Sequence, residues 1–194
     1  MVDLGFSLSL PKKRVVSSVG LEHYLDRVGV NGSSPLQPTE KHETTFMNEK
    51  EYDAPMHSAE HLLNQTMVRM FGCGRAFSSH VERKKSKCDY RIDRVLLEEE
   101  LREIERRVND MIDKGVDVTE EFVTRAQAAE RFNLSRLPES AGDRVRIVRM
   151  GEYDACPCIG PHVQNTKQIG RFKILSSDYN EGVVRIRFKR EAVE

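Results

Sequence analysis

The chain has little that would tie it to a membrane, an export route or a polyanion. It contains four cysteines and no tryptophan, and its 31 basic residues are balanced by 31 acidic ones. No apolar run approaches the roughly 20 residues of a membrane-spanning helix, and the N-terminus lacks the apolar core of a secretory signal. Cysteines without the spacing of a disulfide framework are typical of reduced thiols or metal ligands. We therefore expect a cytoplasmic protein without membrane contact, which would bind any nucleic acid through a local patch.

The first 46 residues differ from the rest of the chain. They show neither helical nor strand periodicity, which predicts a disordered leader. A second interpretation concerns the gene: the tetrapeptide GSSP at 32–35 is what GGT-TCG-AGT-CCC encodes, and this DNA looks like the T-arm of a tRNA gene. On that interpretation residues 1–46 are a mistaken extension and Met47 is the true start. Both interpretations predict a single domain over residues 47–194.

Two helices have clear sequence signals. The first is expected over about 54–71, because Asp53 is a suitable N-cap and Gly72 can end the helix in a left-handed conformation. The second ends at Gly115 and has apolar residues at spacings of four and three. These residues are Leu97, Leu101, Ile104, Val108 and Met111. Their stripe needs a packing surface, for which a sheet is the natural candidate.

The remaining pattern is dominated by strands. Alternation predicts strands over 88–93, 116–123, 144–150, 172–175 and 183–188, with a turn at 178–182 and a brief helix over about 124–132. Val145, Ile147 and Val148 are the expected core contacts of the third strand. The order of elements favours an α+β fold, in which a mixed or antiparallel sheet is backed by helices on one face.

Two distant segments carry the side chains of a zinc site. His57 and His61 are four apart on the first expected helix, so both imidazoles project from one face. Cys158 and His162 flank an Ile-Gly-Pro bend, where glycine can supply an unusual φ and turn both side chains inward. Each residue alone could be an ordinary packing or surface residue. Together they predict one Zn²⁺ per chain in a tetrahedral site with three nitrogens and one sulfur.

These segments resemble the motifs of one family, the editing domain of threonyl- and alanyl-tRNA synthetases and its free-standing AlaX-type relatives. HSAEHLL at 57–63 is similar to the family's H-x-x-x-H helix. CIGPHVQNT at 158–166, followed by IGRFKI at 169–174, is similar to its C-x-G-[TP]-H-V-x-x-T…I-G-x-F-K-I stretch. The resemblance covers nearly everything from 56 to 188. It implies the editing-domain fold, a metal site made by these histidines and the cysteine, and binding of the aminoacylated 3′ end of tRNA.

The resemblance also implies an activity. The chain would be an ATP-independent aminoacyl-tRNA hydrolase that removes a wrongly attached amino acid in trans, because no aminoacylation domain fits in this length. Gly160 and Thr166 would bind the substrate, and no catalytic residue is assigned. Serine on tRNA(Ala) is the expected substrate, followed by serine on tRNA(Thr). A hydroxyl added to alanine or a methyl lost from threonine is hard to exclude at a synthetic site.

Two positions depart from the family pattern. Pro161 is typical of the threonyl branch, whereas the alanyl branch usually has threonine there. The threonyl branch often has an acid two residues before the ligand cysteine, where this chain has Cys156, and the nearest acid is Asp154. This departure weakens any transfer of that acid's catalytic role. It leaves Cys156 as a spare ligand or a redox partner for Cys158.

Other interpretations stay open at this point. The domain could be a zinc-containing RNA- or protein-binding module without catalysis. The sequence at 57–61 also reads H-x-x-E-H, which matches a metalloprotease pattern with Glu60 as general base, but that pattern leaves the second motif unexplained. The densest basic run either contacts tRNA phosphates or is a solvated hairpin edge. It consists of Arg83, Lys84, Lys85 and Lys87.

Overall fold

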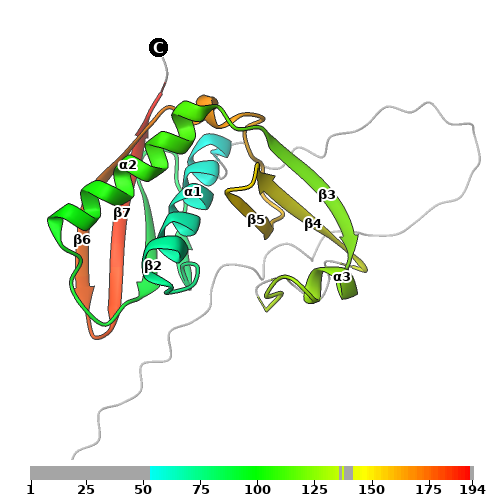
Figure 1. The fold of residues 1–194 in the computed structure, drawn as a ribbon, viewed down its shortest axis with the longest axis horizontal. Coiled ribbons are helices and arrows are strands. Elements are labelled where there is room, and N and C mark those ends of the chain that lie inside the picture. The colour runs from blue at the N-terminus through cyan, green and yellow to red at the C-terminus, as the bar shows by residue number, and fades with distance from the viewer. Residues whose placement is uncertain (1–52, 136, 138–141, 193–194) are drawn as a thin grey trace, which may run out of the picture. The chain divides into compact units, whose positions relative to one another are not determined.

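The structure is a computed structural model that describes residues 53–135, 137 and 142–192. Figure 1 shows the order of its elements. The helices are α1 (Ala54–Phe71), α2 (Glu98–Lys114), α3 (Arg125–Ala129) and the 3-10 helix η2 (Thr166–Ile169). The strands are β1 (Ser78–His80), β2 (Ser86–Arg91), β3 (Val118–Thr124), β4 (Arg144–Met150), β5 (Asp154–Pro157), β6 (Arg171–Asn180) and β7 (Val183–Glu191). The expected leader and the start at Met47 lie outside the described residues. No helix in the described part is long and apolar enough to span a membrane.

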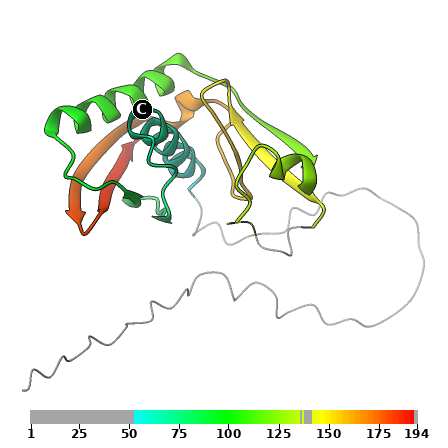
Figure 2. The same cartoon turned by 60° about the horizontal axis from the view of Figure 1, so that its bottom comes forward.

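The α+β class is confirmed, but the strands form two antiparallel sheets where the sequence predicted one. The larger sheet has the order β1-β2-β7-β6, and the smaller one has the order β3-β4-β5. Figures 1 and 2 show α1 and α2 on the same face of the larger sheet. In the larger sheet β7 pairs with β2 on one side and with β6 on the other. The strands that lie between β2 and β6 in the sequence, namely β3, β4 and β5, pair with one another in the smaller sheet.

The main core lies between the larger sheet and these two helices. From α2 it receives Ile104 and Val108, which are fully buried against the sheet residues Ile186 and Phe188. The expected apolar stripe is confirmed except at its first member. Leu97 is 62% exposed, because α2 begins one residue later and Leu97 is its N-cap. The expected core contacts of β4, among them Val145 and Val148, are buried as predicted.

Local signals at helix ends and turns act as expected. The Asp53 side chain accepts a hydrogen bond from the backbone N–H of Met56 at 3.0 Å, and Gly72 ends α1 with φ of 63°. The turn expected over 178–182 is shorter than predicted, because β6 continues to Asn180. Glu181 and Gly182, with φ of 45° and 81°, make a two-residue turn. Two positive φ values are typical of hairpin turns that match the strand twist.

Gly170, which joins η2 to β6, should be the least replaceable glycine of the larger sheet. Its φ of 83° and ψ of −163° lie in a region that is essentially restricted to glycine, and an added Cβ would lie 2.0 Å from the carbonyl oxygen of Glu191. We expect Gly170→Ala to lower the free energy of unfolding by at least about 2 kcal/mol. Gly72→Ala is the control, since its Cβ would meet nothing within 4 Å. Equal losses for both variants in urea titrations would contradict this reading of Gly170.

Candidate metal centre

Two secondary-structure contexts present the predicted ligands to one point. α1 carries His57 and His61, both buried, with ring centroids 5.1 Å apart. Cys158 directly follows β5, and its backbone N–H continues the strand pairing by donating to the carbonyl of Arg146 at 3.1 Å. After the bend, the His162 ring stacks on that of His57 with centroids 4.1 Å apart. The cluster therefore joins α1 to the end of the smaller sheet.

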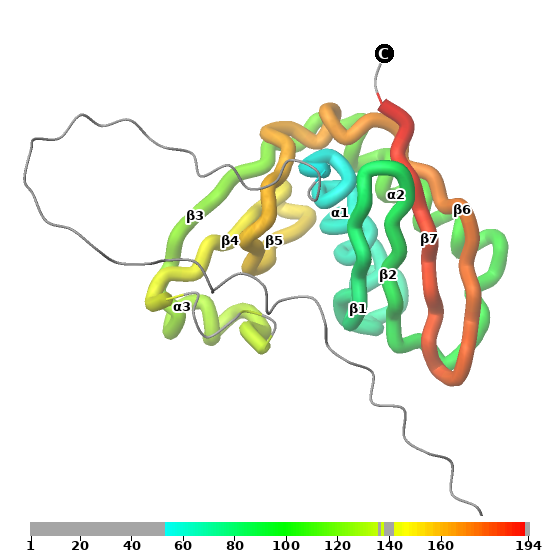
Figure 3. The backbone as a smooth tube through the Cα atoms, turned by 180° about the vertical axis from the view of Figure 1, so that it is seen from behind, coloured from blue at the N-terminus to red at the C-terminus, as the bar shows by residue number. Residues whose placement is uncertain are grey.

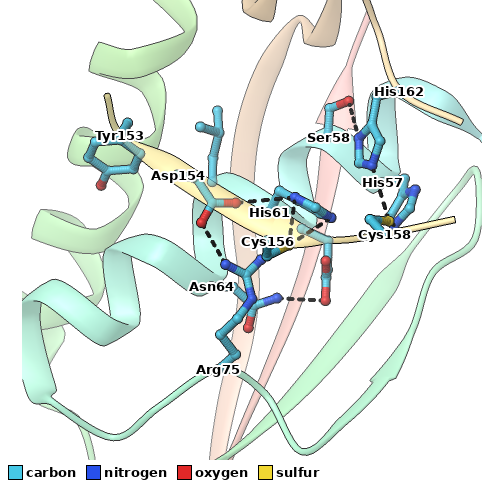
Figure 4. A network of polar contacts seen from close by, with 12 residues as sticks. His57, Ser58, His61, Asn64, Arg75, Tyr153, Asp154, Cys156, Cys158 and His162 are labelled. Carbon is cyan, nitrogen blue, oxygen red and sulfur yellow. Dashed lines mark hydrogen bonds and ion pairs between the residues drawn. The ribbon is translucent and has the colours of Figure 1, made fainter. Parts of the chain in front are cut away.

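The structure brings together all four residues that the sequence predicted as ligands. The Sγ of Cys158 lies 3.4 Å from the Nε2 of His57 and 3.4 Å from the Nε2 of His162. With His61 included, one ligand atom from each residue lies within 4.8 Å of every other (Figure 4). Zinc bonds of about 2.0–2.1 Å to nitrogen and about 2.3 Å to sulfur would place those two atoms about 3.5 Å apart. The four residues thus form a cluster that could hold a metal ion.

Each histidine of the cluster has its second ring nitrogen next to an acceptor. Nδ1 of His57 is 3.1 Å from the carbonyl oxygen of Pro161, and Nδ1 of His61 is 3.2 Å from Oδ2 of Asp154. Nδ1 of His162 is 3.0 Å from Oγ of Ser58. A hydrogen on Nδ1 satisfies all three contacts and leaves every Nε2 lone pair available. Metal-bound histidines show the same arrangement, since the partner fixes both the tautomer and the ring orientation.

The surroundings favour a thiolate at Cys158. Burial alone would raise the pKa of this thiol, but the contacts of its sulfur with the rings of His162, His57 and His61 outweigh burial and lower the pKa to about 3. Burial, opposed by the hydrogen bond to Cys158, also lowers the pKa of His162 to about 4. A deprotonated sulfur and a neutral imidazole are the forms that bind metal ions. The protonation states of Cys158 and His162 are therefore those of metal ligands.

Behind His61 lies a buried polar chain that the sequence did not assign. Asp154 accepts from Nη1 of Arg75 at 2.6 Å and also contacts His61. Burial would raise the pKa of Asp154, but the hydrogen bond from His61 and the positive charge of Arg75 lower it. Period-two alternation along β5 places Asp154, Cys156 and Cys158 on one face, which is a signal for Asp154. Arg75 follows a Gly-Cys-Gly turn, and no local pattern marks it.

Burial also disfavours a charged His61, yet the Coulombic interaction with Cys156 and hydrogen bonds that His61 donates to Asp154, Cys156 and Cys158 raise its pKa well above the usual value. The Sγ of Cys156 is 3.5 Å from Nδ1 of His61. His61, Asp154 and Cys156 form a second group of potential ligand atoms that shares His61 with the first. Cys156 is thus adjacent to the cluster.

The bend that carries Cys158 and His162 is held differently from the way the sequence suggested. Gly160 is not among the glycines with positive φ, so the expected unusual backbone angle is wrong. Instead, Nη1 of Arg146 donates to the carbonyl oxygen of Gly160 at 2.8 Å and to that of Cys158 at 3.3 Å. Arg146 in turn forms an ion pair with Glu120. A side chain of β4 therefore fixes the bend.

The positions of Thr166 and Glu60 bear on the roles that the sequence suggested for them. The Thr166 hydroxyl is fully buried; it donates to the carbonyl of Met111 at 2.8 Å and accepts from the N–H of Val116 at 2.8 Å. These bonds give Thr166 a role in holding the end of α2 and no exposure to a substrate. The buried carboxylate of Glu60 accepts from Asn64 at 2.6 Å. Among the described residues, neither candidate ligand group includes a glutamate.

The basic run lies in the hairpin that joins β1 to β2. Arg83, Lys84 and Lys85 are exposed in the loop, and Lys87 is half-buried in β2. Nε of Arg83 is 3.9 Å from Oδ2 of Asp53, the N-cap of α1. The run therefore lies beside the first turn of the helix that carries His57. His80 is exposed and contacts Glu82, as expected for a surface histidine.

Comparisons with known proteins support a domain like the editing domain of tRNA synthetases. Residues 145–187 match the family model described as the threonyl and alanyl tRNA synthetase second additional domain. This segment contains Cys158 and His162 but not α1. The matches confirm the relationship that the two sequence motifs predicted.

Individual relatives are alanine–tRNA ligases. The chain is 31% identical over 160 residues to that of Clostridioides difficile (strain 630), which covers 81% of this chain and 18% of the relative. It is 30% identical over 174 residues to that of Bdellovibrio bacteriovorus, covering 89% of this chain and 18% of the relative. For Bacillus pumilus the values are 36% over 121 residues, 62% and 14%. The chain thus spans no more than 18% of the length of these relatives.

Proposed function

We propose that the chain is a hydrolase that acts in trans, in the cytoplasm, on the ester of mischarged aminoacyl-tRNA. Serine on tRNA(Ala) is the proposed first substrate and serine on tRNA(Thr) the second. One Zn²⁺ would be held by His57, His61, Cys158 and His162. The observation that carries the proposal is that three Nε2 atoms and one thiolate converge while an acceptor faces each Nδ1. Similarity to alanine–tRNA ligases over most of the chain supplies the substrate class.

The chain's own residues would prepare the site as follows. Pro161, Asp154 and Ser58 orient the three imidazoles, and Arg146 holds the bend so that Gly160 presents its backbone beside the cluster. An aminoacyl ester needs little activation, so positioning of the ester and a water contributes much of the rate. Bound zinc would supply Lewis acidity or lower the pKa of a bound water. The exposed loop of the basic run would contact tRNA phosphates.

One observation favours a second candidate. Four protein ligands fill a tetrahedral coordination sphere, which is typical of a structural zinc site. The domain would then be a zinc-containing RNA- or protein-binding module without hydrolytic activity. The two candidates differ in whether serine is released, because both require the metal and both permit RNA binding.

A deacylation assay with radiolabelled seryl-tRNA(Ala) and seryl-tRNA(Thr) separates them. We expect the protein to release serine from the first substrate faster than from the second. His57→Ala should reduce the rate by more than about 100-fold, since it removes a predicted metal ligand and the loss of even a supporting residue costs about 10–100-fold. His80→Ala is the matched control, an exposed histidine that contacts Glu82, and should stay within about twofold of the wild-type rate.

The outcomes that contradict the proposal are distinct. Release of serine from neither tRNA would overturn the hydrolase and support the binding module. Equal rates of serine release by the His57→Ala and His80→Ala variants would show that the cluster takes no part in the reaction. Cleavage of a peptide substrate would instead support the metalloprotease pattern at 57–61.

A further inference from the structure

The larger sheet has one face that no described element covers. Along β7, Val184, Ile186 and Phe188 are buried toward α1 and α2, while Arg185, Arg187 and Lys189 alternate with them on the other face. Figure 3 shows this face in front of the helices, with β1, β2, β7 and β6 side by side. A polar outer face alone is ordinary for an antiparallel sheet. This face differs from an ordinary one because most of its polar residues are basic.

The uncovered face is strongly basic in a chain with no net charge. We call it the open basic face and define it as the outward residues of β2, β6 and β7 together with the β1–β2 loop. It carries ten cationic side chains and four acidic ones. The cations are Arg83, Lys84, Lys85, Lys87, Arg91, Arg171, Lys173, Arg185, Arg187 and Lys189, and the acids are Glu82, Asp89, Asp178 and Glu191. The basic run recognised in the sequence is thus one end of a larger surface.

Cations of this face lie directly opposite each other in the sheet. Lys87 of β2 pairs in register with Arg187 of β7, and Lys173 of β6 pairs with Lys189 of β7. Like charges at directly opposite positions destabilise a sheet. Acids on the same face offset most of this repulsion, since Asp178 forms an ion pair with Arg187, Glu191 with Lys189 at 2.9 Å and Asp89 with Arg185 at 2.7 Å. Lys87 and Lys173 have no ion pair among the described residues, and a polyanion bound across the strands would supply their counter-charge.

The open basic face also leads to the metal centre. Arg83 at its loop contacts Asp53, and the backbone N–H of His57 donates to the carbonyl of Asp53 at 2.9 Å. One helical turn, about 5.4 Å along the axis, therefore separates the loop contact from the first residue of the cluster. In Figure 3 the loop between β1 and β2 lies next to the first turn of α1. A chain molecule lying on the face could extend one end toward the cluster.

We infer that the open basic face binds the phosphodiester backbone of a structured RNA and so directs its 3′ end to the metal centre. This inference rests on the proposed function and extends its RNA contact from one loop to a whole sheet face. Rows of cations spaced by about 4.8 Å across strands suit a backbone that carries regular charges, and such contacts position a nucleic acid without reading its sequence. Arg91 also stacks over the Phe77 ring at 4.8 Å, which leaves its guanidinium at the same surface.

The test measures binding of an RNA hairpin with a single-stranded CCA end by fluorescence anisotropy over a range of salt concentrations. The variant is Arg91→Gln/Lys173→Gln/Lys189→Gln, which spares the loop run. We expect the dissociation constant to rise at least about tenfold, and the slope of log K against log salt to fall in magnitude by about 2. Arg102→Gln/Arg107→Gln/Lys114→Gln is the matched control, with the same charge change on α2, and should bind like wild type.

Three outcomes are informative. Unchanged RNA affinity and salt slope in the sheet variant, with thermal stability retained, would overturn the inference. Binding of the wild-type protein to phosphatidylserine-containing vesicles but not to the RNA would also overturn it, in favour of a lipid surface. Hydrolysis of a minimal ester, serine attached to adenosine, should be the same in the sheet variant and wild type. If neither hydrolyses it while the sheet variant still loses RNA affinity, the proposed function fails and this inference stands.

Discussion

Cys158→Ala should leave the purified protein with far less than one metal ion per chain. The thiolate is the only sulfur in the predicted ligand set, and it lies 3.4 Å from two of the three Nε2 atoms. Removing it takes a negative charge and one ligand from a site that would otherwise neutralise a divalent ion in part. Elemental analysis by mass spectrometry, after purification without chelators, measures the change directly.

The melting temperature of the protein should depend on whether the metal ion is bound. A ligand present at about 1,000 times its dissociation constant stabilises the folded state by about 4 kcal/mol, which corresponds to a shift of about 10 °C in the melting temperature for a domain of this size. We therefore expect a chelator to lower the melting temperature of the wild type by about 10 °C and to leave that of Cys158→Ala unchanged. Cys73→Ala is the control, because Cys73 lies outside both ligand groups. A Cys158→Ala protein that retains one metal per chain would refute the assignment of the cluster.

Asp154→Ala should be among the most damaging single substitutions in the domain. The carboxylate is buried, accepts from Arg75 at 2.6 Å and faces Nδ1 of His61. Its removal takes the hydrogen-bonded counter-charge away from the largely enclosed Arg75, and breaking a buried ion pair in this way typically costs about 3–5 kcal/mol of stability. The loss of its contact with His61 should weaken metal binding by about 10–100-fold.

Asp154→Asn separates these two roles. The amide oxygen can still accept from His61, so metal affinity should fall less than in the alanine variant, while the missing charge still destabilises Arg75. Asp178→Ala is the matched control, since it removes the partner of Arg187 on an exposed face, where an ion pair contributes about 1 kcal/mol or less. Similar unfolding free energies for the alanine variants at 154 and 178 would show that the buried contacts of Asp154 with Arg75 and His61 contribute no more to stability than an exposed ion pair.

How much the sequence could predict depends on the distance over which a signal acts. The ends of α1 and α2 are set by neighbours in the chain, such as Asp53 and Gly115, and those predictions are confirmed. The division into two sheets depends on β2 pairing with β7, whose residues lie almost a hundred positions apart. Alternation within a strand cannot indicate such a partner. The prediction therefore gave five of the seven described strands, missed the short strands β1 and β5, and did not give the grouping into two sheets.

The same limit applies to the candidate site. His57, His61, Cys158 and His162 were predictable because their side-chain chemistry is specific and their spacing is local within each segment. The residues that hold these four side chains in place were harder to predict. Arg146 contacts the bend across a strand pair, and Ser58 is one of many serines until His162 is placed beside it. Thr166 has a structural role that the motif did not indicate, since its buried hydroxyl holds the end of α2, and its predicted contact with a substrate stays a prediction.

The cluster draws two residues from α1, which packs on the larger sheet, and two from the bend that follows β5 of the smaller sheet. A metal ion held there would cross-link these two segments, which are about a hundred residues apart in the sequence. In cells short of that metal, α1 and the end of the smaller sheet would then lack this link. The supply of the ion would set how much of the protein is competent.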